Sequence, residues 1–189
     1  MKRRKVGSAP GKADDPAKQQ EQREFVEKQL NPRLDEAEQG QRKFFVDASH
    51  FVFGAFLCYV WCFVRWFLRT PAGRQRHNVL GALDYVSKQM ITVANTTYIH
   101  AVVVCELLRV IADQHPGTPI TLVMDNARYQ HCQLVQEKAK ALSIELLFLP
   151  SYSPNLNLIE RVWKFVKAEC LGGKHYENFE QFQQGSTIA

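Results

Sequence analysis

Three acidic residues are candidates for a shared site in which each carboxylate would be paired or bound to metal. Asp47 follows the apolar run "FFV", and Asp125 follows the apolar and β-branched run "TLVM". Glu160 lies in "SPNLNLIERVWKFVK", whose spacing predicts an amphipathic helix. Burying an ionised carboxylate costs several kcal/mol unless it is paired or bound to metal. The two strand aspartates therefore favour one shared site, in which three carboxylates bind hard divalent cations through oxygen.

Each acidic residue also has a purely structural interpretation. Asp125, followed by Asn126, could be a turn residue at the end of a strand. Asn157 could cap a helix with Glu160 at its third position, and Glu160 could pair with Lys164 for about 0.2–0.5 kcal/mol. The spacing favours the site, because the 35 positions from Asp125 to Glu160 hold one helix, one strand and a turn. Such an excursion returns the chain to the same edge of a sheet.

The elements that must position these residues follow from hydrophobic periodicity. Strands are expected at 43–51, 119–125 and 144–150, and a hairpin at 78–87 and 90–97. Helices are expected at 98–115, 132–143 and 158–171, the first stopped by Pro116 and Gly117. The order β, hairpin, α, β, α, β, α predicts an α/β fold with a mixed sheet flanked by helices.

Residues 1–41 differ in character from residues 42–189 and are predicted to form a basic polar arm and a linker helix. Residues 1–43 carry 11 Lys/Arg and 8 Asp/Glu, which leaves 13 and 11 for the rest of the chain. This small excess argues only weakly for nucleic acid. The basic cluster at 2–5 could bind phosphate or be a solvated terminus. A surface helix around Phe25 and Leu30 is expected to break near Pro32.

Composition argues against a disulfide scaffold, a zinc site and a membrane protein. The five cysteines form no CxxC pair and their number is odd, which predicts reduced thiols in a cytosolic chain without a signal peptide. The 14-residue uncharged stretch at 51–64 is shorter than the roughly 18–20 residues that a membrane span needs. Its aromatic and β-branched content predicts a buried strand instead.

Four segments together resemble a known family. "FFVDASHF", "GRQRHNVLGALD", "ITLVMDNARYQ" and "LLFLPSYSPNLNLIERVWKFVKAECL" are similar to the catalytic domain of DDE transposases, in the bacterial insertion-sequence group related to the mariner elements. The resemblance covers roughly residues 42–182 and, more loosely, "GKADDPAKQQ". The combination of "LVMDNA" with "YSPNLNLIERVWK" downstream is highly specific.

The resemblance implies a ribonuclease-H-like fold, with a mixed five-stranded sheet flanked by helices, and assigns the three acidic roles. Asp47, Asp125 and Glu160 would be the catalytic, metal-binding residues for two divalent cations, Mg²⁺ or Mn²⁺. Asp47 would bridge both ions, and Asp125 and Glu160 would each hold one. Members of the family bind terminal inverted repeats, cut the element ends with water as nucleophile, and join the freed 3′-hydroxyl to target DNA.

Neighbouring residues extend the expected site. Asn126 could orient a metal ligand, and Arg128 could contact a phosphate. Lys164 and Lys167 share the helix face of Glu160, so they are either DNA-backbone contacts or solvated charges. Trp163 is expected to be a core anchor, with base stacking as the alternative. His50 could act near Asp47 or be a satisfied hydrogen-bonding residue.

The chain also departs from the family pattern. A complete transposase of this group carries a helix-turn-helix region before the catalytic domain, and residues 1–43 do not supply that region. A further helix is expected where the chain ends at "FEQFQQGSTIA". One expectation is therefore a cytoplasmic, nucleoid-associated enzyme that acts as a homodimer or with a DNA-binding partner from an upstream frame. The alternative is a truncated, non-catalytic remnant that binds DNA or full-length transposase as a regulator.

Overall fold

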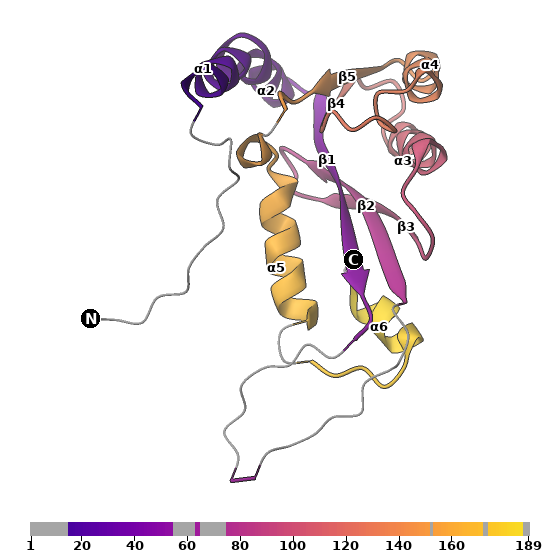
Figure 1. Ribbon diagram of the computed structural model, residues 1–189. Helices are drawn as coiled ribbons and strands as arrows, with labels where there is room; N and C mark the ends of the chain where they lie inside the picture. Colours follow the sequence, from indigo (N-terminus) through magenta and orange to yellow (C-terminus); the bar gives the residue numbers. More distant parts are fainter. Residues whose placement is uncertain (1–14, 55–62, 65–74, 152, 172–173, 187–189) are drawn as a thin grey trace, which may run out of the picture.

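The structure, a computed structural model, describes residues 15–54, 63–64, 75–151, 153–171 and 174–186. These residues form a five-stranded sheet in the order β3-β2-β1-β4-β5, with helices on both faces (Figure 1). The strands are β1 (Arg42–Val52), β2 (Arg76–Asp84), β3 (Met90–Asn95), β4 (Ile120–Met124) and β5 (Ile144–Phe148). The helices are α1 (Pro16–Phe25), η1 (Val26–Leu30), α2 (Asn31–Glu38), α3 (Ala101–Gln114), α4 (Gln133–Ala141), η2 (Pro154–Leu156), α5 (Ile159–Leu171) and α6 (Phe179–Ser186).

The sheet is mixed, as the order of the predicted elements indicated. β1 pairs antiparallel with β2 and parallel with β4, and β4 pairs parallel with β5. β2 and β3 form the expected hairpin. Its turn is held by Asp84, whose carboxylate accepts bonds from the backbone N–H groups of Val86 and Ser87 at 2.8 and 3.0 Å and pairs with Arg42 at 2.9 Å.

Alternation along the parallel strands divides the core into two clusters, one on each face of the sheet. Odd-numbered Phe45, Val123 and Leu147 face one cluster, which α5 and α6 complete with side chains such as Trp163 and Phe182. Even-numbered residues of the same strands face the other cluster, under α3 and α4. Because successive strand side chains point to opposite faces, an odd or even residue number in these strands indicates which helices the side chain packs against.

Helix α3 covers the second face and begins three residues later than expected. The sequence predicts a helix from Tyr98, but the helical span starts at Ala101. The reason is His100, which has extended backbone angles and whose imidazole nitrogen accepts the backbone N–H of Val102 at 3.3 Å. This contact satisfies one of the free N–H groups at the helix start, so His100 acts as the N-cap.

The linker helix does not break at Pro32, contrary to the expectation. The chain stays helical from Pro16 to Glu38 through the π-turn η1, in which the N–H of Asn31 bonds to the carbonyl of Val26. A π-turn just before a proline accommodates the ring and the missing N–H without ending the helix. Phe25 and Leu30 are buried in the cluster that α5 completes, so this helix packs on the sheet. The boundary between an arm and a domain at residue 41 remains a prediction.

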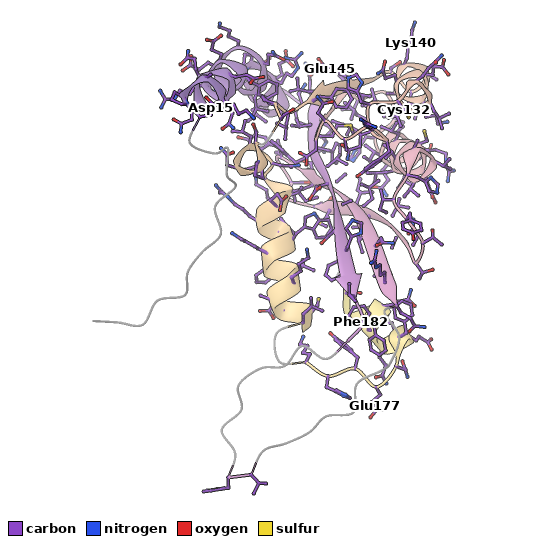
Figure 2. All side chains as sticks on the ribbon, viewed as in Figure 1. Asp15, Cys132, Lys140, Glu145, Glu177 and Phe182 are labelled. Carbon is purple, nitrogen blue, oxygen red and sulfur yellow. The ribbon has the colours of Figure 1, made fainter. Side chains whose placement is uncertain are left out.

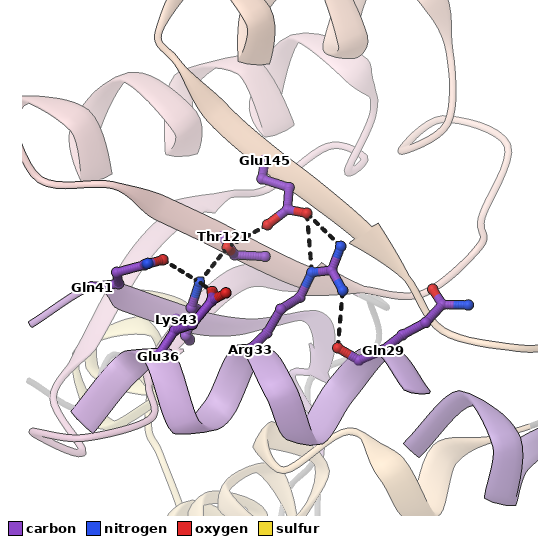
Figure 3. Close-up of polar contacts among 7 residues, drawn as sticks. All are labelled: Gln29, Arg33, Glu36, Gln41, Lys43, Thr121 and Glu145. Atoms are coloured by element: carbon purple, nitrogen blue, oxygen red, sulfur yellow. Dashed lines mark hydrogen bonds and ion pairs between the residues drawn. The ribbon is translucent and has the colours of Figure 1, made fainter. Parts of the chain in front are cut away.

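Polar contacts fasten α2 to the first residues of the parallel strands (Figure 3). The buried ammonium of Lys43 lies 3.0 Å from Glu36 and donates to the Thr121 hydroxyl at 2.8 Å. That hydroxyl donates to Glu145 at 2.7 Å, and Arg33 donates to the same carboxylate through two nitrogens at 2.6 and 3.0 Å. Glu145 lies at one end of the sheet and Phe182 of α6 at the other (Figure 2). The network thus fixes the sheet end remote from α6.

Several expectations fall partly outside the described residues. Of the buried strand expected at 51–64, Phe51 and Val52 belong to β1 and Phe51 is buried. The prediction is wrong for Phe63 and Val64, which are exposed and not in a strand, and residues 55–62 lie outside the described part. No helix among the described residues is long and apolar enough to cross a membrane. In the described part of the chain Cys105, Cys132 and Cys170 are free thiols, and Cys58 and Cys62 lie outside it.

Candidate active site at the ends of two parallel strands

Asp47 and Asp125 lie at the same level of two neighbouring parallel strands. The β1–β4 register ends with the pair Val46 and Met124; Asp47 is the next residue of β1, and Asp125 is the first residue after β4. Both have odd numbers, so both follow Phe45 and Val123 on the face that α5 covers. Neighbouring strands lie about 4.8 Å apart. The two carboxylates therefore project side by side toward one helix.

Glu160 comes from the first turn of α5, which runs alongside β1 (Figure 1). Ile159, Trp163 and Val166 are buried on one side of this helix, which leaves Glu160 exposed at the edge of the contact with the sheet. Burial, together with the negative charges of Glu160 and Asp125, raises the pKa of Asp47 to about 7. Asp47 thus lies within electrostatic range of both Asp125 and Glu160.

Asn157 does not cap α5 through its side chain, contrary to one sequence interpretation. The amide is buried, and its Nδ2 donates to the Val46 carbonyl at 3.1 Å and to Asp125 Oδ1 at 3.4 Å. Spacing along one helix could not reveal this, since the partners lie on two strands of the sheet. Burial raises the pKa of Asp125, and this hydrogen bond lowers it. Asn157 therefore ties the entry to α5 to both strands that carry the aspartates.

The expected pair between Glu160 and Lys164 is also absent, since no ion pair joins these two described residues. Lys164 is exposed. Lys167 is exposed too, but its ammonium lies 5.9 Å from the centre of the Phe51 ring. Its positive charge lowers the pKa of Asp47, which places it within electrostatic range of the site. Of the two lysines, Lys167 is the one that the structure relates directly to a carboxylate.

The loop after β4 holds the remaining predicted residues. Asn126 and Arg128 are both exposed. Asn126 and Asp125 line an open pocket of about 360 Å³ with Pro150, Ser151 and Ser153. Arg128 does not line this pocket. His50 bonds to Asn78 at 2.7 Å and has an even number, so it points to the face opposite Asp47. The structure thus gives His50 the hydrogen-bonded interpretation, directed away from Asp47.

Two neighbours of the site escaped sequence reasoning. Burial raises the pKa of Tyr129, and the charges of Asp47 and Asp125 raise it further, so its hydroxyl lies in the field of both. Gly81 is the register partner of Asp47 on β2, and the indole of Trp163 fills the space beside it. Trp163 is buried, which confirms its prediction as a core anchor. The local sequence around Tyr129 and Gly81 does not predict that they lie near the site, because both contacts depend on packing between distant segments.

The oxygen donors of the site suit hard divalent cations. Carboxylates at this density repel one another without a cation. The buried Oδ1 of Asn157 has no hydrogen-bond partner among the described residues, which leaves an acceptor beside Asp125. No three His, Cys, Asp or Glu side chains in the described ranges converge on a single point that could hold one ion.

Comparison with known proteins identifies the family. The sheet order and the helices on both faces are those of the ribonuclease-H-like fold. A family model described as DDE superfamily endonuclease matches residues 44–183. The match covers well over half of the chain, so the chain belongs to this family. This confirms the resemblance that the sequence segments indicated. No curated protein matches the chain significantly.

Solved structures with the same fold include transposases. The Mos1 transposase paired-end complex with left transposon end has a TM-score of 0.67 at 17% identity, over 97% of this chain and 57% of that one. The catalytic domain of Mos1 mariner transposase has a TM-score of 0.62 at 14% identity, over 95% and 91%. A simian T-cell lymphotropic virus intasome has a TM-score of 0.53 at 15% identity, over 79% and 44%.

These likenesses confirm the predicted fold. The chain spans 44% and 57% of the intasome and paired-end complex chains, so it corresponds to about half of each.

Proposed function

We propose that this chain is the catalytic domain of a transposase that cuts DNA strands at the ends of a mobile element and transfers them to target DNA. The observation that carries the proposal is the placement of Asp47 and Asp125 one residue beyond the paired Val46 and Met124, with the charge of Glu160 close enough to affect Asp47. Family membership supports the same chemistry, because the family is one of endonucleases.

Asp47, Asp125 and Glu160 are the proposed ligands for two ions. By analogy with the family, Asp47 would be the ligand shared by both ions, with one further carboxylate for each; the charges of Glu160 and Asp125 both act on Asp47, which supports this assignment. Related structures were determined with Mn and with Mg, which supports either metal for this chain. Two such ions, when bound, activate the attacking oxygen and stabilise the leaving oxygen of an in-line phosphoryl transfer.

The protein's own groups set the geometry for that chemistry. The Asn157 amide holds Asp125 in one orientation and also bonds to β1 at Val46, where the pairing with β4 ends. Asn126, on the pocket next to Asp125, is the proposed second orienting residue. Lys167, Lys164 and Arg128 are exposed cations around the site and are proposed to contact the DNA backbone.

DNA is the proposed partner, as terminal inverted repeats and as target. The related transposase structures are described as transposon-end and strand-transfer complexes, which supports this assignment. A homodimer or a DNA-binding chain from an upstream frame would supply recognition of the ends. A cytoplasmic, nucleoid-associated location follows from such a substrate.

One experiment tests the proposal. The purified protein is incubated with Mg²⁺ or Mn²⁺ and a supercoiled plasmid that carries the inverted repeats flanking its coding sequence. Nicking at the 3′ ends of the repeats is expected, and Asp125→Asn should abolish it. Metal-independent nicking, or an active Asp125→Asn protein, would contradict the proposal. Binding to this plasmid without any cleavage under Mn²⁺ would instead support a non-catalytic regulator.

A further inference from the structure

Gly81 occupies a position where a side chain does not fit. It pairs with Asp47 across the β1–β2 register. A Cβ atom at residue 81 would lie 2.8 Å from Cζ2 of Trp163 and 2.8 Å from Cε of Met90. Real Cβ atoms essentially never come within 3.0 Å of such neighbours. The bare backbone of Gly81 is therefore what lets the indole rest on the sheet beside Asp47.

Trp163 is the side chain through which α5 contacts this part of the sheet. It follows Glu160 by three residues, so the two side chains project on neighbouring sides of one helical turn. Trp163 is 4% exposed, and its ring packs edge-on against that of Phe51 with 6.4 Å between the ring centres. The indole thus contacts Phe51 on the strand of Asp47 and Gly81 on the next strand. Its Nε1 has no partner among the described residues, so the fit rests on shape.

We propose that Gly81 and Trp163 are positioning residues that set the distance of α5 from the sheet, and thereby the approach of Glu160 to Asp47. This inference rests on the proposed function, in which both carboxylates bind the catalytic ions. It assigns a role in the site to a glycine that carries no chemical group. It also gives the buried core residue Trp163 a second role, which is to position Glu160.

The two neighbours of Gly81 differ in how they can respond to a methyl group. The Met90 contact is the end of a flexible side chain, which can rotate away. The indole is rigid, and burial under α5 leaves it no free space, so the helix must move with it. A site of this kind tolerates only about 0.5 Å of displacement. Moving a ligand by about 1 Å can cost on the order of 100-fold in rate.

The test uses size compensation between the two residues. Gly81→Ala adds the methyl group, and Trp163→Phe removes the indole atoms that it would meet. The double variant should therefore restore the approach of the helix. Gly54→Ala is the matched control, since a Cβ at Gly54 meets nothing within 4 Å. Four measurements compare the proteins: single-turnover nicking of the repeat-bearing plasmid, its dependence on Mn²⁺, Mn²⁺ binding by electron paramagnetic resonance without DNA, and the thermal midpoint.

Gly81→Ala is expected to weaken Mn²⁺ binding and slow nicking at saturating Mn²⁺, each by about tenfold or more. The double variant should return both to within about threefold of the parent, although its thermal midpoint need not recover. A folded Gly81→Ala protein with parental Mn²⁺ binding would overturn the proposal, as would a double variant no better than Gly81→Ala. If the parent binds Mn²⁺ but does not nick, the proposed function fails, and the binding comparison alone still decides the positioning role.

Discussion

The side chain of Asn157 donates to Asp125 at 3.4 Å while the same nitrogen donates to the backbone of Val46 at 3.1 Å. One buried amide therefore joins the start of α5 to the two neighbouring chain segments that carry the aspartates, at the end of the β1–β4 pairing. The contact explains how Glu160, three residues further along, is held relative to the sheet. It also explains why an asparagine that looks like a helix cap is buried.

Replacing Asn157 should reduce both stability and activity. Asn157→Ala leaves the Val46 carbonyl without its side-chain donor and frees the Asp125 carboxylate to rotate. The expected loss is about 1–3 kcal/mol in the free energy of unfolding and at least about tenfold in nicking rate. Urea denaturation and single-turnover nicking measure the two effects. An Asn157→Ala protein with parental stability and rate would show that the amide has no such role.

The raised pKa of Asp47 predicts a pH dependence of stability in cation-free protein. The carboxyl titrates near 3.8 when exposed and near 7 in the folded chain, so the folded state binds the proton more tightly. This contribution is fully present below pH 3.8 and is lost as the pH rises through 7, with a magnitude of at most about 4 kcal/mol. Asp47→Asn cannot titrate and should be more stable than the parent at pH 8.

Calorimetry in EDTA at pH 5 and pH 8 checks this prediction. The thermal midpoint of the parent should fall relative to that of Asp47→Asn between the two values. Adding Mg²⁺ at pH 8 should raise the midpoint of the parent more than that of Asp47→Asn, because the cation neutralises the repelling charges. Parallel pH profiles of the two proteins would count against a buried, charge-repelled Asp47.

The buried Lys43 should be important for attaching α2 to the sheet. Lys43→Ala removes the ammonium shared by Glu36, Gln41 and Thr121, and is expected to cost about 3 kcal/mol of unfolding free energy. Limited proteolysis should then cut within residues 16–38 more readily. Lys28, which pairs with Glu24 at the surface, is the matched control. If Lys28→Ala lowers the denaturation midpoint as much as Lys43→Ala, the network is not specific.

Lys167 should contribute to DNA binding through the phosphate backbone. Lys167→Ala is expected to weaken binding uniformly across sequences and to lower the salt dependence of the affinity by about one unit of slope. Fluorescence anisotropy at several KCl concentrations measures both quantities. Lys140 on α4, which packs on the opposite face of the sheet, is the control. Equal losses for Lys140→Ala and Lys167→Ala would mean that the effect is only one of net charge.

Sequence patterns predict the parts of the site that depend on local order. Asp47 and Asp125 are recognisable because each follows an apolar run that predicts a core strand. The sheet follows from the order of strands and helices. The continuous helix through Pro32 was missed, because a π-turn accommodates the proline that normally ends a helix.

Contacts between distant segments explain the other misses. Asn157 fits a helix cap as well as it fits a cross-strand tie, and only the closed fold decides between them. Gly81 has no local signal either, since its lack of space arises from an indole 82 positions later. The polar residues that fasten α2 likewise depend on which strands become neighbours.

The most direct test of the central claim is the rate of Mn²⁺-dependent nicking in four near-isosteric variants. Asp47→Asn, Asp125→Asn and Glu160→Gln should each lower the single-turnover rate on the repeat-bearing plasmid on the order of 1,000-fold or more, with unchanged circular dichroism. Glu169→Gln, an exposed acidic residue on the same helix as Glu160, should leave the rate unchanged. Retention of activity within tenfold by any of the first three proteins would contradict a three-carboxylate site.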